Sequence, residues 1–139
     1  MKSYDFWKYF ETNPAGIALT CTLSGTGSAT ALLLPTGKII VDASAAQAGK
    51  TITLTTPVAF KVLDAMSIHG DGTGCVFQLK NGSNALTTTV TVAGSDKDID
   101  RATSVDDAYD DFATGDDDLV IAITSAAFTG RIIIDIQYT

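Results

Sequence analysis

The chain has 139 residues, of which 45% are hydrophobic and 18% are charged; sixteen acidic and nine basic residues give a formal net charge of -7. This length suits a single domain, and so apolar a composition excludes a chain that stays disordered. An acidic chain repels phosphate backbones and anionic headgroups, and no apolar stretch approaches the ~20 residues that cross a bilayer. We therefore expect no nucleic-acid partner and no membrane association, and neither a signal peptide nor a membrane anchor.

An N-terminal arm, residues 1–16, precedes the patterned part of the chain. It combines aromatic and charged side chains and ends in a breaker that contains Pro14 and Gly16. Large aromatic side chains carry much of the energy of protein interfaces, and so short a segment cannot form a core of its own. We expect these aromatics to bind a partner, with docking on their own domain or stacking on sugar rings as alternatives; they are Tyr4, Phe6, Trp7, Tyr9 and Phe10.

From residue 17 onward apolar and hydroxyl side chains alternate, which predicts strands with one buried face. The pattern starts at residues 17–23 and is followed by a glycine-rich turn. Pro35 and Gly37 separate two apolar runs, which predicts a hairpin. Alternation returns at residues 51–55 and again from residue 58, where a change of phase near Leu63-Asp64 predicts a β-bulge.

The second half of the chain continues this pattern with one interruption. Apolar residues at 75–79 lead into Asn81-Gly82, a dipeptide that predicts a tight hairpin. Further strands are expected at residues 86–92, 119–123 and 128–138. Residues 104–115 begin like a capping box and predict one short helix. Many short strands with turns between them predict an antiparallel all-β domain over residues 17–139, a sandwich or a barrel.

An acidic stretch is the main candidate for ionic chemistry. Four of its aspartates reproduce positions one, three, five and twelve of a calcium loop, but Arg101 stands where position six requires glycine. A solvated acidic face is the alternative that we favour, and we expect no metal site. The stretch contains ten of the sixteen acidic residues: Asp96, Asp98, Asp100, Asp106, Asp107, Asp110, Asp111, Asp116, Asp117 and Asp118.

The sequence offers little material for catalysis. His69 is the only histidine, and a serine or cysteine nucleophile needs a positioned base. Cys21 and Cys75 are the only cysteines; two buried thiols are expected, and a disulfide would need neighbouring strands. We therefore expect no catalytic residue, no cofactor and no enzymatic activity.

Four segments together resemble small jelly-roll proteins of bacteriophage particles, the head-decoration and head-fibre proteins. They are the Pro-Val-Ala-Phe-Lys-Val-Leu-Asp-Ala strand at residues 57–65, the Val-Phe-Gln-Leu-Lys-Asn-Gly segment at 76–82, residues 101–108, and the closing apolar strand. The resemblance covers rather more than half of the chain and leaves the arm unmatched. It implies an antiparallel β-sandwich of jelly-roll type, assembled as a homotrimer on a capsid surface.

On this resemblance we expect a capsid decoration, or cement, protein that binds the outside of the major capsid protein and stabilises the shell. It would be made in the host cytoplasm and reside on the exterior of the virion. The alternative from another class is a glycan- or host-surface-binding module of a head fibre or tail, with Trp7 or Tyr109 stacking on sugar rings.

Overall fold

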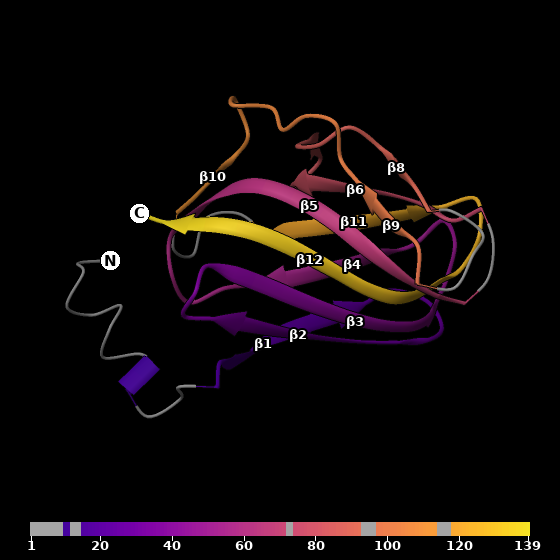
Figure 1. The fold of residues 1–139 in the computed structure, drawn as a ribbon, viewed down its shortest axis with the longest axis horizontal. Coiled ribbons are helices and arrows are strands. Elements are labelled where there is room, and N and C mark those ends of the chain that lie inside the picture. Colours follow the sequence, from indigo (N-terminus) through magenta and orange to yellow (C-terminus); the bar gives the residue numbers. More distant parts are fainter. Residues whose placement is uncertain (1–9, 12–14, 72–73, 93–96, 114–117) are drawn as a thin grey trace.

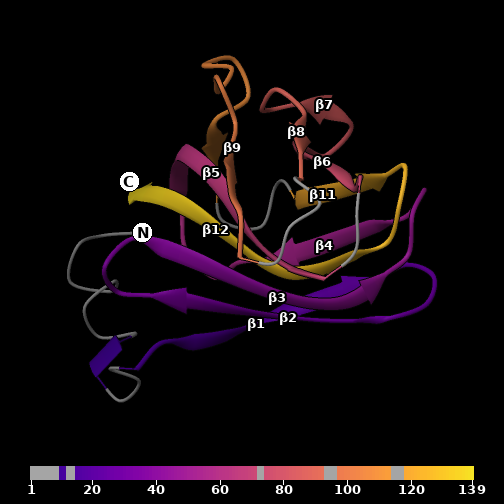
Figure 2. The same ribbon diagram turned by 45° about the vertical axis from the view of Figure 1, so that its right-hand side comes forward.

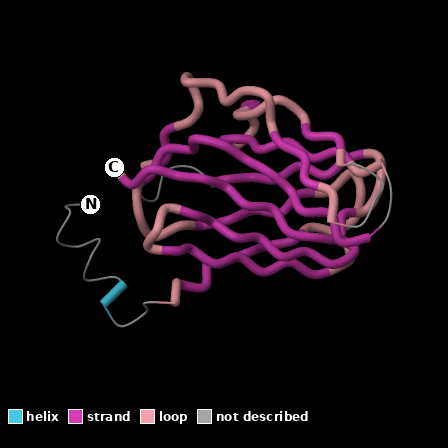
Figure 3. Tube along the Cα trace, in the orientation of Figure 1, coloured by secondary structure: helices cyan, strands magenta, loops and turns pink. Residues whose placement is uncertain are grey.

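The computed structural model describes residues 10–11, 15–71, 74–92, 97–113 and 118–139. Within these ranges the regular structure is almost entirely antiparallel strand, as expected, and helical geometry is confined to residues 10 and 11 (Figure 3). The strands are β1 Ile17–Leu23, β2 Ser28–Leu34, β3 Lys38–Ala46, β4 Thr51–Thr55, β5 Phe60–Asp71, β6 Val76–Asn81, β7 Asn84–Ala85, β8 Val90–Thr91, β9 Ile99–Arg101, β10 Asp111–Phe112, β11 Leu119–Thr124 and β12 Phe128–Tyr138.

The strands form two layers that share β1 (Figures 1 and 2). The larger sheet runs β1-β2-β3-β12-β5, with β9 and β10 both paired to the outer edge of β5. The smaller sheet runs β1-β4-β11-β6, with β7 and β8 both paired to β6. The first half of β1 pairs with β2 and its second half with β4, so this strand links the layers along one side.

From β3 to β6, and again from β11 to β12, successive strands alternate between the two sheets. β3, β5 and β12 lie in the larger sheet, whereas β4, β6 and β11 lie in the smaller sheet. The orders β3-β12-β5 and β4-β11-β6 are those of a two-sheet jelly roll, to which β1 and β2 add a hairpin. The prediction of an antiparallel all-β fold is confirmed.

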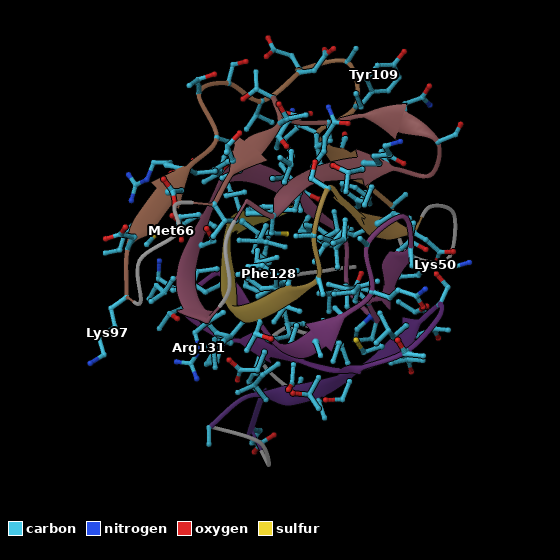
Figure 4. All side chains as sticks on the ribbon, turned by 90° about the vertical axis from the view of Figure 1, so that its right-hand side faces the viewer. Lys50, Met66, Lys97, Tyr109, Phe128 and Arg131 are labelled. Carbon is cyan, nitrogen blue, oxygen red and sulfur yellow. The ribbon has the colours of Figure 1, made fainter. Side chains whose placement is uncertain are left out.

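The core lies between the sheets because alternate residues of each strand point inward. In β12, for example, Ile132, Ile134 and Ile136 are buried. Aromatic rings pack within the core: the buried Phe60 and Phe112 rings stack with centroids 4.9 Å apart. Phe128 lies between the two sheets, as Figure 4 shows.

Three local predictions are confirmed. The β2–β3 hairpin closes with the Gly37 amide donating to the Leu34 carbonyl at 3.1 Å. Gly82, at φ 59°, begins the two-residue turn between β6 and β7. The ladder between β12 and β5 shifts its register after Asp135, so that Leu63 is the extra residue of a bulge and is 54% exposed.

The predicted helix is wrong for residues 104–113, while residues 114–117 lie outside the described part. Val105 instead forms a β-bridge with Thr87, and residues 106–109 form a turn in which the Asp106 carboxylate accepts from the Ala108 amide at 2.9 Å. The neighbouring strands compete for the backbone of this segment: the Asp106 amide donates to Leu86 at 2.8 Å, and the Asp110 carbonyl accepts from Val62 at 2.9 Å. This crossing segment, residues 102–112, therefore spans the open side of the sandwich: it leaves the edge of the larger sheet after β9, contacts the smaller sheet near Leu86 and Thr87, and returns to the larger sheet at β10.

Among the described residues, no helix has the length and apolar character needed to cross a membrane.

Candidate interaction surfaces

The aromatic residues of the arm are predicted to bind a partner. Of these residues, the structure describes only the last, Phe10. Phe10 is 4% exposed and belongs to the core of its own domain. For Phe10 the alternative of docking on its own domain is therefore the one observed, and its ring is not available to a partner. The other predicted binding residues, Tyr4, Phe6, Trp7 and Tyr9, lie outside the described residues.

Tyr138, at the end of β12, holds Phe10 in place. The two rings meet edge to face with centroids 6.2 Å apart. The Tyr138 hydroxyl donates to the Leu34 carbonyl of β2 at 2.6 Å, and burial raises the pKa of Tyr138 to about 12. Phe10 thus fixes the point at which the chain enters the domain, beside the C-terminal end of strand β12.

The outer face of the larger sheet carries an apolar row. Leu32, Ile40, Ile133 and Met66 are cross-strand partners on β2, β3, β12 and β5, and each lies between two buried residues of its own strand. Their side chains therefore point outward, where all four are half-buried. We call these four residues the apolar row. Four large apolar side chains in register across four strands make a contiguous patch of the kind that marks an interaction site.

Four charged residues flank the apolar row on the two central strands. On β3, Lys38 and Asp42 stand on either side of Ile40; on β12, Asp135 and Arg131 stand on either side of Ile133. Lys38 forms an ion pair with Asp135. Arg131 donates to both oxygens of Asp42, at 2.7 and 3.2 Å, and this contact raises the pKa of Arg131. The four charges form a two-by-two checkerboard around the centre of the row.

A polar hollow of about 410 Å³ lies against the outer edge of the smaller sheet. Gln78 of β6 donates to the Thr87 carbonyl at 2.8 Å on its wall, and the Thr88 hydroxyl oxygen accepts from the Thr103 amide at 2.9 Å. Tyr109, 36% exposed, follows the hollow's Asp106 in the same turn. Figure 4 shows Tyr109 on a different side of the molecule from Met66 and Arg131. The residues that line the hollow are Gln78, Ala85, Leu86, Thr87, Thr88, Ser104 and Asp106.

The acidic stretch brings no metal-ligand cluster together in the part that the structure describes. Seven of its ten aspartates are described, and nowhere in the described ranges do three or more His, Cys, Asp or Glu side chains gather around a common point. The calcium-loop alternative depends on Asp96, which lies outside those ranges. Asp110 pairs instead with Lys61, at 3.7 Å.

Neither cysteine is bonded, and the two lie far apart in the smaller sheet. Cys21 is on β1 and Cys75 immediately precedes β6, so that β4 and β11 lie between them. Burial raises the pKa of both thiols, that of Cys75 to about 11. Both are therefore protonated at neutral pH, which is the unreactive form of a thiol.

Sequence reasoning missed the apolar row, although a signal for it exists. A strand with one wet face alternates apolar and polar residues, whereas Leu32-Leu33-Leu34, Ile39-Ile40-Val41 and Ile132-Ile133-Ile134 are unbroken apolar runs. Such runs in neighbouring strands indicate a sheet with two apolar faces. The lateral order of β2, β3 and β12, which the sequence does not give, aligns the runs into one row.

No family model matches this chain, and comparisons with curated proteins and with solved structures found no match.

Proposed function

We propose that this chain is a structural protein of a bacteriophage particle, a decoration protein that binds the outside of the major capsid protein and stabilises the shell. Such a protein acts by binding other proteins and not by catalysing a reaction. A protein that binds the assembled shell, and does not bind its separate subunits, stabilises the shell by mass action. Several contacts on each virion increase this stabilisation.

One observation carries the proposal: the arm is tethered at a fixed point. Phe10 is buried against Tyr138, which fixes the chain at this residue beside the end of β12. Four further aromatic residues precede Phe10 within a few positions. A tethered segment rich in aromatics suits a groove on a neighbouring protein, because Tyr and Trp bury a large area at a low cost in conformational entropy.

The resemblance to phage decoration proteins supports the same proposal. Its first three segments fall on the start of β5, on β6 with its turn, and on the end of β9 with the segment that follows. The closing segment is β12. β6 belongs to the smaller sheet, whereas β5, β9 and β12 belong to the larger sheet, so the segments that carry the resemblance contribute to both layers of one sandwich.

Removal of residues 1–9 tests the proposal. We expect the shortened chain to fold, because Phe10 and the core remain, and to lose co-sedimentation with capsids assembled from the major capsid protein of the same genome. The matched control is the full-length chain with Tyr109→Ala, which alters an exposed aromatic side chain outside the arm. Capsid binding that is unchanged by the deletion, or absent from the full-length chain, would refute the proposal.

A second candidate function is glycan binding, which the polar hollow beside Tyr109 favours. Amide, hydroxyl and carboxylate groups line the hollow, and an exposed aromatic ring close by suits stacking on a sugar. A glycan array probed with the full-length chain and with Gln78→Ala tests it. A signal that requires Gln78 would favour this function, and an array without signal would exclude it.

A further inference from the structure

The apolar row is an uncommon feature for a face that meets water. In an antiparallel sheet with one wet side, outward positions are expected to be polar. Here the outward positions at the centres of β2, β3, β12 and β5 are Leu32, Ile40, Ile133 and Met66. Figure 4 shows Met66 on the outside of the sandwich, on the same side as Arg131 and away from Phe128 in the core.

The charges on this face balance one another, in contrast to the rest of the chain. Three of the nine basic residues pair with aspartates on this face: Lys38 with Asp135, Arg131 with Asp42, and Arg101 with Asp64. Lys61 of β5 pairs with Asp110, which precedes β10. These pairs add no net charge, although the chain as a whole carries a formal charge of -7. Two copies of the chain repel each other because both are acidic, but the paired charges on this face add no net charge to that repulsion.

The checkerboard of charges is complementary to itself. A two-fold axis in the plane of the face and along the apolar row places Lys38 opposite Asp42 of the second copy, and Arg131 opposite Asp135 of the second copy. A two-fold axis along the strands, between β3 and β12, places Lys38 opposite Asp135 and Asp42 opposite Arg131. In both cases unlike charges meet at all four corners, and the apolar row of one copy meets that of the other.

We propose that the outer face of the larger sheet is a self-association surface, and that its occupant is a second copy of this chain related by a two-fold axis. Both axes keep the strands of the two copies aligned, as in the aligned class of face-to-face sheet packing. A two-fold contact is isologous, so one self-complementary patch suffices to form a closed pair. This assembly differs from the homotrimer that the sequence resemblance implies.

The assembly goes beyond capsid decoration and does not depend on it. Each dimer would also carry two N-terminal arms. Two linked arms bind a repetitive surface more tightly than one, because the second contact is intramolecular.

The first test places a charge in the apolar row. Ile133→Lys buries an unpaired lysine at the centre of the contact, and we expect it to raise the dissociation constant of the pair at least about 100-fold. The matched control is Val120→Lys, which makes the same change at an outward position between two buried residues of β11 in the smaller sheet. Sedimentation velocity of the full-length chains should show a pair for the wild type and for Val120→Lys, and a monomer for Ile133→Lys. Circular dichroism checks that both variants are folded.

The second test inverts the checkerboard and keeps both ion pairs within the chain. The fourfold variant Lys38→Asp, Asp135→Lys, Asp42→Lys and Arg131→Asp is again complementary to itself, so it should form pairs. Opposite the wild type, however, it brings like charges together at every corner under either axis. Native mass spectrometry of a mixture should therefore show both homodimers and less than about a tenth of the statistical amount of heterodimer.

Three results would overturn the proposal. One is a wild-type chain that stays monomeric at about 100 µM, a concentration that populates even weak pairs. Another is an oligomer, a trimer included, whose mass Ile133→Lys leaves unchanged. The third is free exchange of subunits between the wild type and the inverted variant. Capsid binding can succeed or fail in any of these cases, so the two proposals are tested separately.

Discussion

Gly130 shows how one residue sets the course of β12. Its φ of 150° is unfavourable for other residues, and a Cβ atom here would lie 2.5 Å from the Ile68 carbonyl oxygen and 2.9 Å from the Gly70 nitrogen. The register between β12 and β5 shifts at this position. The absence of a side chain therefore lets the two strands approach closely at the end of the sandwich.

We expect Gly130→Ala to lower the free energy of unfolding by about 2–4 kcal/mol, because backbone atoms of β5 would have to move. Gly82→Ala is the matched control: Gly82 also has a positive φ, but a Cβ there meets nothing within 4 Å. It should cost only about 1–2 kcal/mol. Urea denaturation of the two variants measures the difference, and equal losses would contradict the steric argument.

Tyr138 makes stability depend on alkaline pH. Its pKa is raised to about 12 in the folded chain, so the folded state holds this proton more tightly than the unfolded state does. The resulting stabilisation is complete below the ordinary tyrosine pKa near 10 and is lost as pH rises from there to about 12.

Tyr138→Phe should remove this part of the pH dependence. We expect the free energy of unfolding to fall less steeply between about pH 10 and 12 in the variant than in the wild type. Loss of the hydrogen bond to Leu34 should lower stability at neutral pH by about 1 kcal/mol. The contribution of Cys75, whose pKa is raised to about 11, remains in both proteins. Identical slopes in urea titrations at several pH values would refute this role for Tyr138.

At the scale of elements, Asn81 ties the crossing segment to the smaller sheet. Its side chain is 9% exposed and donates to the carbonyls of Tyr109 and Asp111, at 3.0 and 3.2 Å. The sequence indicates only that Asn81 is a turn residue before Gly82. No local pattern reveals the tie, because its partners lie 28 and 30 positions further along the chain.

Asn81→Ala should loosen the crossing segment. We expect a loss of about 1–3 kcal/mol in the free energy of unfolding, since two carbonyls lose their donor. Hydrogen exchange should become faster at the Val62 amide, which donates to Asp110 in this segment. Asn84→Ala, at an exposed position of β7, is the matched control. Exchange at Val62 that is unchanged in Asn81→Ala would show that the segment is held by other contacts.

Local patterns predicted the strands and turns well, and they predicted the lateral arrangement poorly. Period-two alternation located β1, β4, β6, β11 and β12, and the change of phase near Leu63 located the bulge. The helix prediction at 104–113 was wrong, because hydrogen bonds to residues far along the chain, at Leu86 and Val62, outweighed the local capping signal. The apolar row escaped prediction for the same reason: it exists only once the order of the strands is known.

At the scale of the whole molecule, the features on which the proposals rest lie in different places on the described part of the sandwich. The Phe10 anchor lies beside the C-terminal end of β12, the polar hollow lies at the edge of the smaller sheet, and the apolar row crosses the larger sheet. In our proposals the arm binds the capsid and the apolar row binds a second copy of the chain. The two surfaces can act together, because self-association doubles the number of arms.

Hydroxyl-radical footprinting of the wild-type chain as a function of its concentration tests the central claim most directly. Met66 lies in the apolar row, and its thioether is among the side chains most readily oxidised. Tyr109 lies on another side of the molecule and serves as the internal reference (Figure 4). If the row is covered by a second copy, oxidation of Met66 should fall as concentration rises from about 1 to 100 µM, while Tyr109 stays constant. Oxidation of Met66 that is independent of concentration over this range would contradict the account.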